Sequence, residues 1–103
     1  MENLVKAQDY LESKIKDTYR LAHSYRVANI GKEIAEKEGL NVEDLMIACL
    51  LHDVSYCMPF KTQDEWQNHG RVSSKMVREF LESIDYPKER IRNICFAIAI
   101  HVD

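Results

Sequence analysis

Four histidines and one aspartate are the residues of this sequence most suited to chemistry. His52 and Asp53 are adjacent in "ACLLHDVSY", where they follow a run of apolar residues. An ionised carboxylate in such a setting costs several kcal/mol unless a partner compensates its charge. Neutral imidazole nitrogens and carboxylate oxygens are ligands of divalent cations. The pair therefore predicts a cation beside Asp53; the alternative is an Asp53 that turns to water while His52 bonds a backbone carbonyl.

Each histidine is also in register with the apolar face of an expected helix. The four are His23, His52, His69 and His101. For example, His23 precedes Val27 by four residues, and His101 follows Ile98 by three. A single inward histidine is usually a hydrogen-bonded core residue. Four of them require either four separate partners or one shared polar centre, and a divalent cation is the simplest shared centre.

Helical spacing of apolar residues extends over nearly the whole chain, and no stretch alternates with the period of a strand. We expect five helices, over about residues 2–16, 19–38, 41–56, 69–84 and 87–101, with a loop over 57–68. Val27, Ile30 and Ile34 are expected on the inner face of the second helix. Gly39 should end that helix, and Asn41 with Asp44 should open the next. The sequence thus predicts a compact all-α bundle.

Composition argues against several classes of protein. The chain has 103 residues, of which 46% are hydrophobic and 30% charged, with a net charge of −3. No apolar run approaches the ~20 residues that span a bilayer, and no secretory leader is recognisable. The negative charge gives no general attraction for nucleic acid or anionic membranes. Three cysteines without CxxC spacing indicate a reducing, cytoplasmic environment.

A histidine on one helix, followed about thirty residues later by "LLHD" on the next, resembles the signature of the HD-domain superfamily of metal-dependent phosphohydrolases. The similar segments are "AHSYRVANIGKEIAEKEGL", "LMIACLLHDVSY" and "HGRVSSKMVREFLESIDYPKERIRNICFAIAIHVD", so the resemblance covers about residues 20–103. It implies that His23, His52 and Asp53 are metal ligands and that His52 and Asp53 belong to the catalytic centre. It also implies that His69 and His101 bind a second metal or the substrate phosphate.

Two departures from that pattern affect the expectations. The family's site is completed by an aspartate on a later helix, whereas Asp103, about 200° around the helix from His101, would face away. We therefore expect residues 1–103 to form one HD-like domain lacking its C-terminal helices, with an apolar stripe that could pair with a second copy. Some nucleotidases of the superfamily also carry a water-orienting glutamate at the position of Tyr56, so that version of the mechanism is not expected.

The resemblance implies hydrolysis of a phosphomonoester or phosphoanhydride, with a nucleotide as the expected substrate. The cation, for which Mn, Mg, Fe, Co, Ni and Zn all stay open, would lower the pKa of a bound water. Arg26, three residues after His23, either grips phosphate oxygens or is an exposed surface charge. Trp66 either stacks on a base or anchors its loop. Lys61 and Arg71 are expected to be solvated surface charges.

Two other functions remain open at this stage. HD-type hydrolases of dinucleoside polyphosphates also place a histidine-glycine pair before this helix, as in His69-Gly70. A metal-binding helical interaction module without turnover is the alternative outside the enzymes. Nucleic-acid binding as the primary role is not expected, because the sequence has no basic stripe.

Overall fold

The computed structural model describes residues 1–58 and 62–100, and every regular element within them is helical. The elements are α1 (Glu2–Lys14), α2 (Thr18–Glu38), α3 (Val42–Leu51), the 3₁₀ helix η1 (Val54–Cys57), α4 (Gln63–Gln67), α5 (His69–Ser83) and α6 (Lys88–Ile100). The all-α prediction is therefore confirmed. Six α-helices are described rather than five, because the segment expected to be a loop over 57–68 contains α4, whose first turn is capped by the Thr62 hydroxyl.

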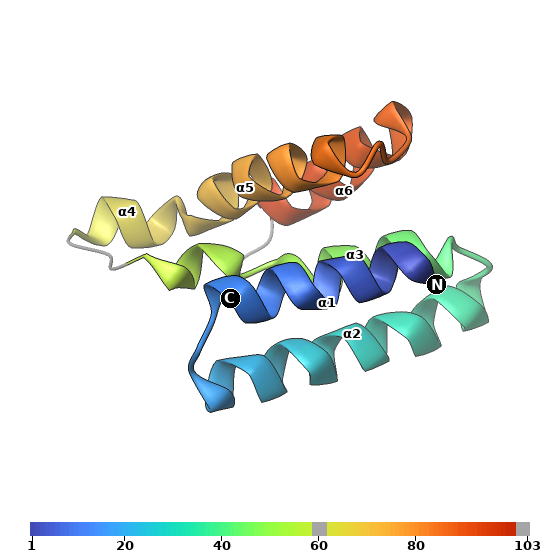
Figure 1. Cartoon of the computed structure of the whole chain (residues 1–103), viewed down its shortest axis with the longest axis horizontal. Coiled ribbons are helices and arrows are strands. Elements are labelled where there is room, and N and C mark those ends of the chain that lie inside the picture. Colours follow the sequence, from blue (N-terminus) through green and yellow to red (C-terminus); the bar gives the residue numbers. More distant parts are fainter. Residues whose placement is uncertain (59–61, 101–103) are drawn as a thin grey trace.

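The helices form two groups that meet at α3 (Figure 1). In one group α3 lies beside α1 and α2; in the other, α5 and α6 form an antiparallel hairpin, with α4 leading into α5. α3 packs against α1, α2 and α6, and η1 packs against α5. A helix covered on several sides has to be apolar around most of its circumference, which explains the run of apolar residues before His52.

Local sequence signals set the ends of these helices. Asp17 caps α2 by accepting hydrogen bonds from the backbone N–H groups of Tyr19 and Arg20, at 2.8 and 3.2 Å. Gly39 ends α2 in the left-handed conformation at φ 71°, and the Asn41 side chain accepts from the N–H of Asp44 at 2.9 Å. The predicted boundary between the second and third helices is thus confirmed.

The inward face of α2 differs from the prediction. Ile30 and Ile34 are 54% and 47% exposed, and Val27 is half-buried. The buried residues are instead small: Ser24, Ala28, Gly31 and Ala35. This row lies about 100° from the row of larger side chains. Small residues let two helix backbones approach closely, so packing against α3 favours them over the isoleucines.

The third helix also ends earlier than expected. Its last α-helical residue is Leu51, and His52 and Asp53 lie in the turn between α3 and η1. Asp53 has φ −115° and ψ 23°, which takes the chain out of the helix. The prediction that the pair lies on one helix was therefore wrong, and this turn determines where both side chains point.

Two further observations concern the chain as a whole. Cys95 is buried, Cys49 and Cys57 are half-buried, and none of the three forms a disulfide. Across the described residues, no helix has both the length and the apolar character that crossing a membrane requires.

Candidate metal and catalytic centre

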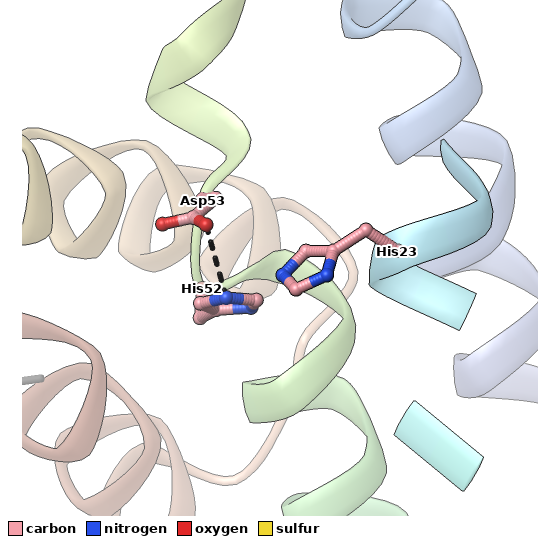
Figure 2. A group of neighbouring side chains, drawn as sticks. All are labelled: His23, His52 and Asp53. Atoms are coloured by element: carbon pink, nitrogen blue, oxygen red, sulfur yellow. Dashed lines mark ion pairs between the residues drawn. The ribbon is translucent and has the colours of Figure 1, made fainter. Parts of the chain in front are cut away.

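His23, His52 and Asp53 converge on one point, although His23 comes from α2 and the other two from the turn after α3 (Figure 2). One ligand atom from each residue lies within 4.8 Å of the corresponding atoms of the other two. His52 Nε2 is 3.0 Å from Asp53 Oδ2, and the rings of His23 and His52 have centroids 5.8 Å apart. The proximity that the sequence predicted for these three side chains is present, while their role as metal ligands stays a prediction.

The end of α3 and the packing of α2 together position this group. Asp53 is only 9% exposed, and its backbone carbonyl accepts the first hydrogen bond of η1 from the N–H of Tyr56 at 3.0 Å. His23 lies one position away from the small-residue row of α2, so its half-buried side chain reaches the edge of the α2–α3 interface. The three side chains therefore meet at the rim of the core rather than inside it.

A third histidine approaches Asp53 from the other helical group. His69 is the first residue of α5, is buried, and places its Nε2 atom 3.3 Å from Asp53 Oδ1. Asp53 thus has one carboxylate oxygen beside His52 and the other beside His69. The sequence placed His69 on an inward face, but it did not reveal that His69 would contact this particular carboxylate.

Backbone carbonyls fix the orientation of both imidazoles. His52 Nδ1 is 2.6 Å from the carbonyl oxygen of Cys49, and His69 Nδ1 is 2.6 Å from that of Trp66. A carbonyl oxygen can only accept a hydrogen bond, so Nδ1 carries the hydrogen in both rings. In the neutral imidazole this leaves the lone pair on Nε2, the atom that faces Asp53.

The chemistry of this group of donor atoms fits a divalent cation. A lone pair on Nε2 facing a carboxylate oxygen is repulsive unless positive charge lies between them, either a proton on each ring or a bound metal ion. A histidine that donates Nδ1–H to a backbone carbonyl and offers Nε2 has the arrangement usual for metal ligands. Two imidazoles and a carboxylate match a metal site with three protein ligands, which leaves a further coordination position to water or substrate.

A buried serine pair connects the turn after Asp53 to the start of α5. The backbone N–H of Ser55 donates to Ser73 Oγ at 3.0 Å, and Ser73 Oγ donates to Ser55 Oγ at 2.8 Å. Ser55 Oγ in turn donates to the carbonyl oxygen of His69 at 3.0 Å. Both serines are fully buried. Sequence reasoning overlooked this positioning role, although polar residues at core positions near His52 and His69 were the available signal.

The remaining predicted residues fall into two sets. Arg26 and Arg71 are exposed, and Trp66 is 44% exposed with its ring centroid 5.9 Å from that of His69. The solvated position expected for Arg71 is therefore present, and Trp66 contacts a candidate ligand through both its ring and its carbonyl. Three predicted positions lie outside the described residues: Lys61, His101 and Asp103.

Comparison with known proteins identifies the family of this chain. The family described as HD domain matches residues 20–103, which include His23, His52, Asp53 and His69. The chain belongs to the HD-domain family. This HD domain is 32% identical over 89 residues to Ribonuclease Y of Mycoplasma mycoides, an alignment that covers 78% of the chain. The chain spans 20% of the length of that relative. No solved structure matches it significantly.

Proposed function

We propose that this HD domain hydrolyses a phosphomonoester or phosphoanhydride bond of a nucleotide, using a divalent cation held by His23, His52 and Asp53. The observation that carries the proposal is the orientation of the ligands: His52 presents Nε2 to Asp53 Oδ2 at 3.0 Å while its Nδ1–H is held by a backbone carbonyl. Membership in a superfamily of metal-dependent phosphohydrolases supports the reaction class.

Each candidate residue has its own role in this proposal. A bound cation lowers the pKa of water near it and offsets the charge that develops on phosphoryl oxygens. His52 and Asp53, from the turn after α3, and His23, from α2, would hold that cation. His69, which lies beside the other oxygen of Asp53, would bind a second cation or a phosphate oxygen. His101 and Arg26 remain predicted contacts of the same kind.

Metal analysis combined with an assay tests this proposal. The purified chain would be loaded in turn with Mn²⁺, Mg²⁺, Fe²⁺, Co²⁺, Ni²⁺ or Zn²⁺ and tested for bound metal and for phosphate release from nucleoside mono-, di- and triphosphates. His23→Ala should lose both metal and turnover, whereas Asn29→Ala, an exposed change on the same helix, should retain both. Wild-type protein that binds no divalent metal would contradict the proposal.

Two observations favour chemically related substrates, which should be included in the same assay. The His69-Gly70 pair at the start of α5 favours dinucleoside polyphosphates, which would be cleaved between two nucleosides. The relative named Ribonuclease Y favours an RNA phosphodiester, so a short single-stranded RNA belongs in the panel. Bound metal without turnover of any substrate would indicate the metal-binding interaction module instead.

A further inference from the structure

A basic pocket lies close to the candidate metal centre, where the α1–α2 connection approaches η1. It has a volume of about 280 Å³ and is lined by residues that include Lys14, Lys16, Asp17, Arg20 and Tyr56. Three of these side chains are cationic and one is anionic. The chain as a whole has a net charge of −3, so this concentration of positive charge is a local feature.

The one carboxylate in the pocket already accepts hydrogen bonds from the backbone. Asp17 Oδ1 accepts hydrogen bonds from the N–H groups of Tyr19 and Arg20 as the cap of α2. These bonds stabilise the carboxylate and hold it at the helix end. The three cationic side chains therefore leave the pocket with an excess of positive charge, which favours an anionic ligand.

Contacts connect this pocket to the candidate metal centre. The Arg20 guanidinium carbon lies 3.8 Å from the centroid of the Tyr56 ring, and that ring lies 5.4 Å from the ring of His69. Arg20 also precedes His23 by three residues of α2, a rise of about 4.5 Å along the helix. An anion in the pocket would thus be a near neighbour of a phosphate bound at the metal ligands.

Arg20 is the best-placed of the three cations. A guanidinium stacked on an aromatic ring keeps its N–H groups available around its edge, where they can bond two phosphate oxygens. Lys16 Nζ donates to the carbonyl oxygen of Glu12 at 2.9 Å, and Lys14 Nζ lies 5.8 Å from the Tyr10 ring centroid. Both lysines would have to leave these exposed contacts, so we expect a smaller contribution from each.

We infer that this pocket binds a second phosphoryl group of the substrate, and hence that the substrate is a phosphoanhydride rather than a monoester with a single phosphate. The inference rests on the proposed function for the position of the reacting phosphate. The binding of the second phosphate itself depends only on Lys14, Lys16, Arg20 and Tyr56. It can therefore be measured without metal and without turnover.

The test is calorimetric binding of inorganic tripolyphosphate and orthophosphate to the metal-depleted chain at low ionic strength. Tripolyphosphate should bind at least tenfold more tightly than orthophosphate. Arg20→Ala should weaken tripolyphosphate binding tenfold or more, and Arg20→Lys should only partly restore it. The pair Lys14→Ala/Lys16→Ala is matched by Lys32→Ala/Lys37→Ala, which removes the same charge from exposed positions further along α2. Only the first pair should weaken binding.

Three outcomes would overturn the inference: no tripolyphosphate binding, equal losses in the two lysine pairs, or tighter binding of a short RNA of equal charge. Activity assays distinguish the inference about the pocket from the proposed hydrolase function. With metal present, Arg20→Lys should raise KM for nucleoside triphosphates by a larger factor than KM for monophosphates. Tripolyphosphate binding without hydrolysis of any substrate would count against the proposed function alone. Hydrolysis of monoesters without tripolyphosphate binding would count against the pocket alone.

Discussion

The same kind of hydrogen bond orients both histidines that flank Asp53. His52 and His69 each direct Nδ1 to the carbonyl oxygen of the residue three positions earlier, Cys49 and Trp66 respectively. A ring held in this way loses little further rotational freedom when Nε2 binds a metal. The loss of side-chain entropy on metal binding is therefore small. The backbone carbonyls of Cys49 and Trp66 therefore contribute to the candidate site, because they fix which nitrogen of each ring faces Asp53.

Replacing His52 by alanine tests whether this orientation serves a metal. Because His52 follows the last α-helical residue of α3, His52→Ala should leave the far-UV circular dichroism unchanged while metal binding is lost. Added metal should raise the melting temperature of the wild type, by mass action on the folded state, and should not raise that of the variant. Metal content can be measured by atomic emission. Equal metal content in both proteins would contradict the ligand assignment.

The buried serine pair makes a separate prediction. Ser73→Ala removes both the acceptor of the Ser55 N–H and the hydroxyl that donates to Ser55 Oγ, so the buried Ser55 N–H loses its partner. We expect a loss of about 1–3 kcal/mol in the free energy of unfolding, measured by urea titration. The exposed Ser13→Ala is the control. A variant as stable as the wild type would show that the pair does not hold η1 against α5.

At the scale of elements, the site depends on how closely α2 approaches α3. A Cβ atom at Gly31 would lie 2.7 Å from the Sγ atom of Cys49 and 3.4 Å from its Cβ atom. An alanine at this position would either displace the Cys49 sulfur or increase the separation of α2 and α3. Because His23 is on α2 and His52 follows α3, a change in that separation would also change the distance between two candidate ligands.

A double mutant measures this close contact. Gly31→Ala alone should destabilise the chain and weaken metal binding, even though alanine favours a helix over glycine by about 1 kcal/mol. Adding Cys49→Ala removes the sulfur that the new methyl group meets, so Gly31→Ala/Cys49→Ala should be more stable than Gly31→Ala. Urea titration of the four proteins in this cycle gives the coupling free energy. Additive effects would contradict a direct contact.

At the scale of the whole molecule, the two helical groups are joined at both ends of α3. At its end, His69 of α5 reaches Asp53. At its start, Tyr86 donates its hydroxyl hydrogen to Asp44, and Arg90 bonds the same carboxylate with Nε at 2.8 and 3.0 Å. The α5–α6 hairpin is thus attached to α3 by polar contacts in addition to the shared apolar core.

The contact at Tyr86 predicts a dependence of stability on alkaline pH. Burial, followed by the hydrogen bond to Asp44, raises the pKa of Tyr86 above its usual value near 10. The unfolded chain therefore loses this proton first, and the stabilisation, which is complete below about pH 10, declines as the pH rises further. Tyr86→Phe should be less stable than the wild type at pH 8, and the difference should shrink at pH 11. A difference independent of pH, measured by urea titration, would contradict this account.

The sequence by itself determined the features that depend on neighbours along the chain. Helical periodicity, the glycine at position 39 and the cap at Asn41 set the helices and one of their boundaries, because these signals act within a few residues. The adjacency of His52 and Asp53 is likewise fixed along the chain, whereas the expectation that His23 would face them came from its inward register on another helix and from the resemblance to the HD-domain superfamily. Those three side chains lie together in the structure.

Only the tertiary structure decided which faces and ends come into contact. It selected the small residues of α2 over Ile30 and Ile34, moved Asp53 out of α3, brought His69 to that carboxylate, and joined the Ser55–Ser73 pair to the backbone of His69. It also placed Arg20 on Tyr56, which no spacing along the chain predicts. The physical reason is that these outcomes depend on packing between helices distant in sequence, where side-chain volume and backbone approach outweigh local periodicity.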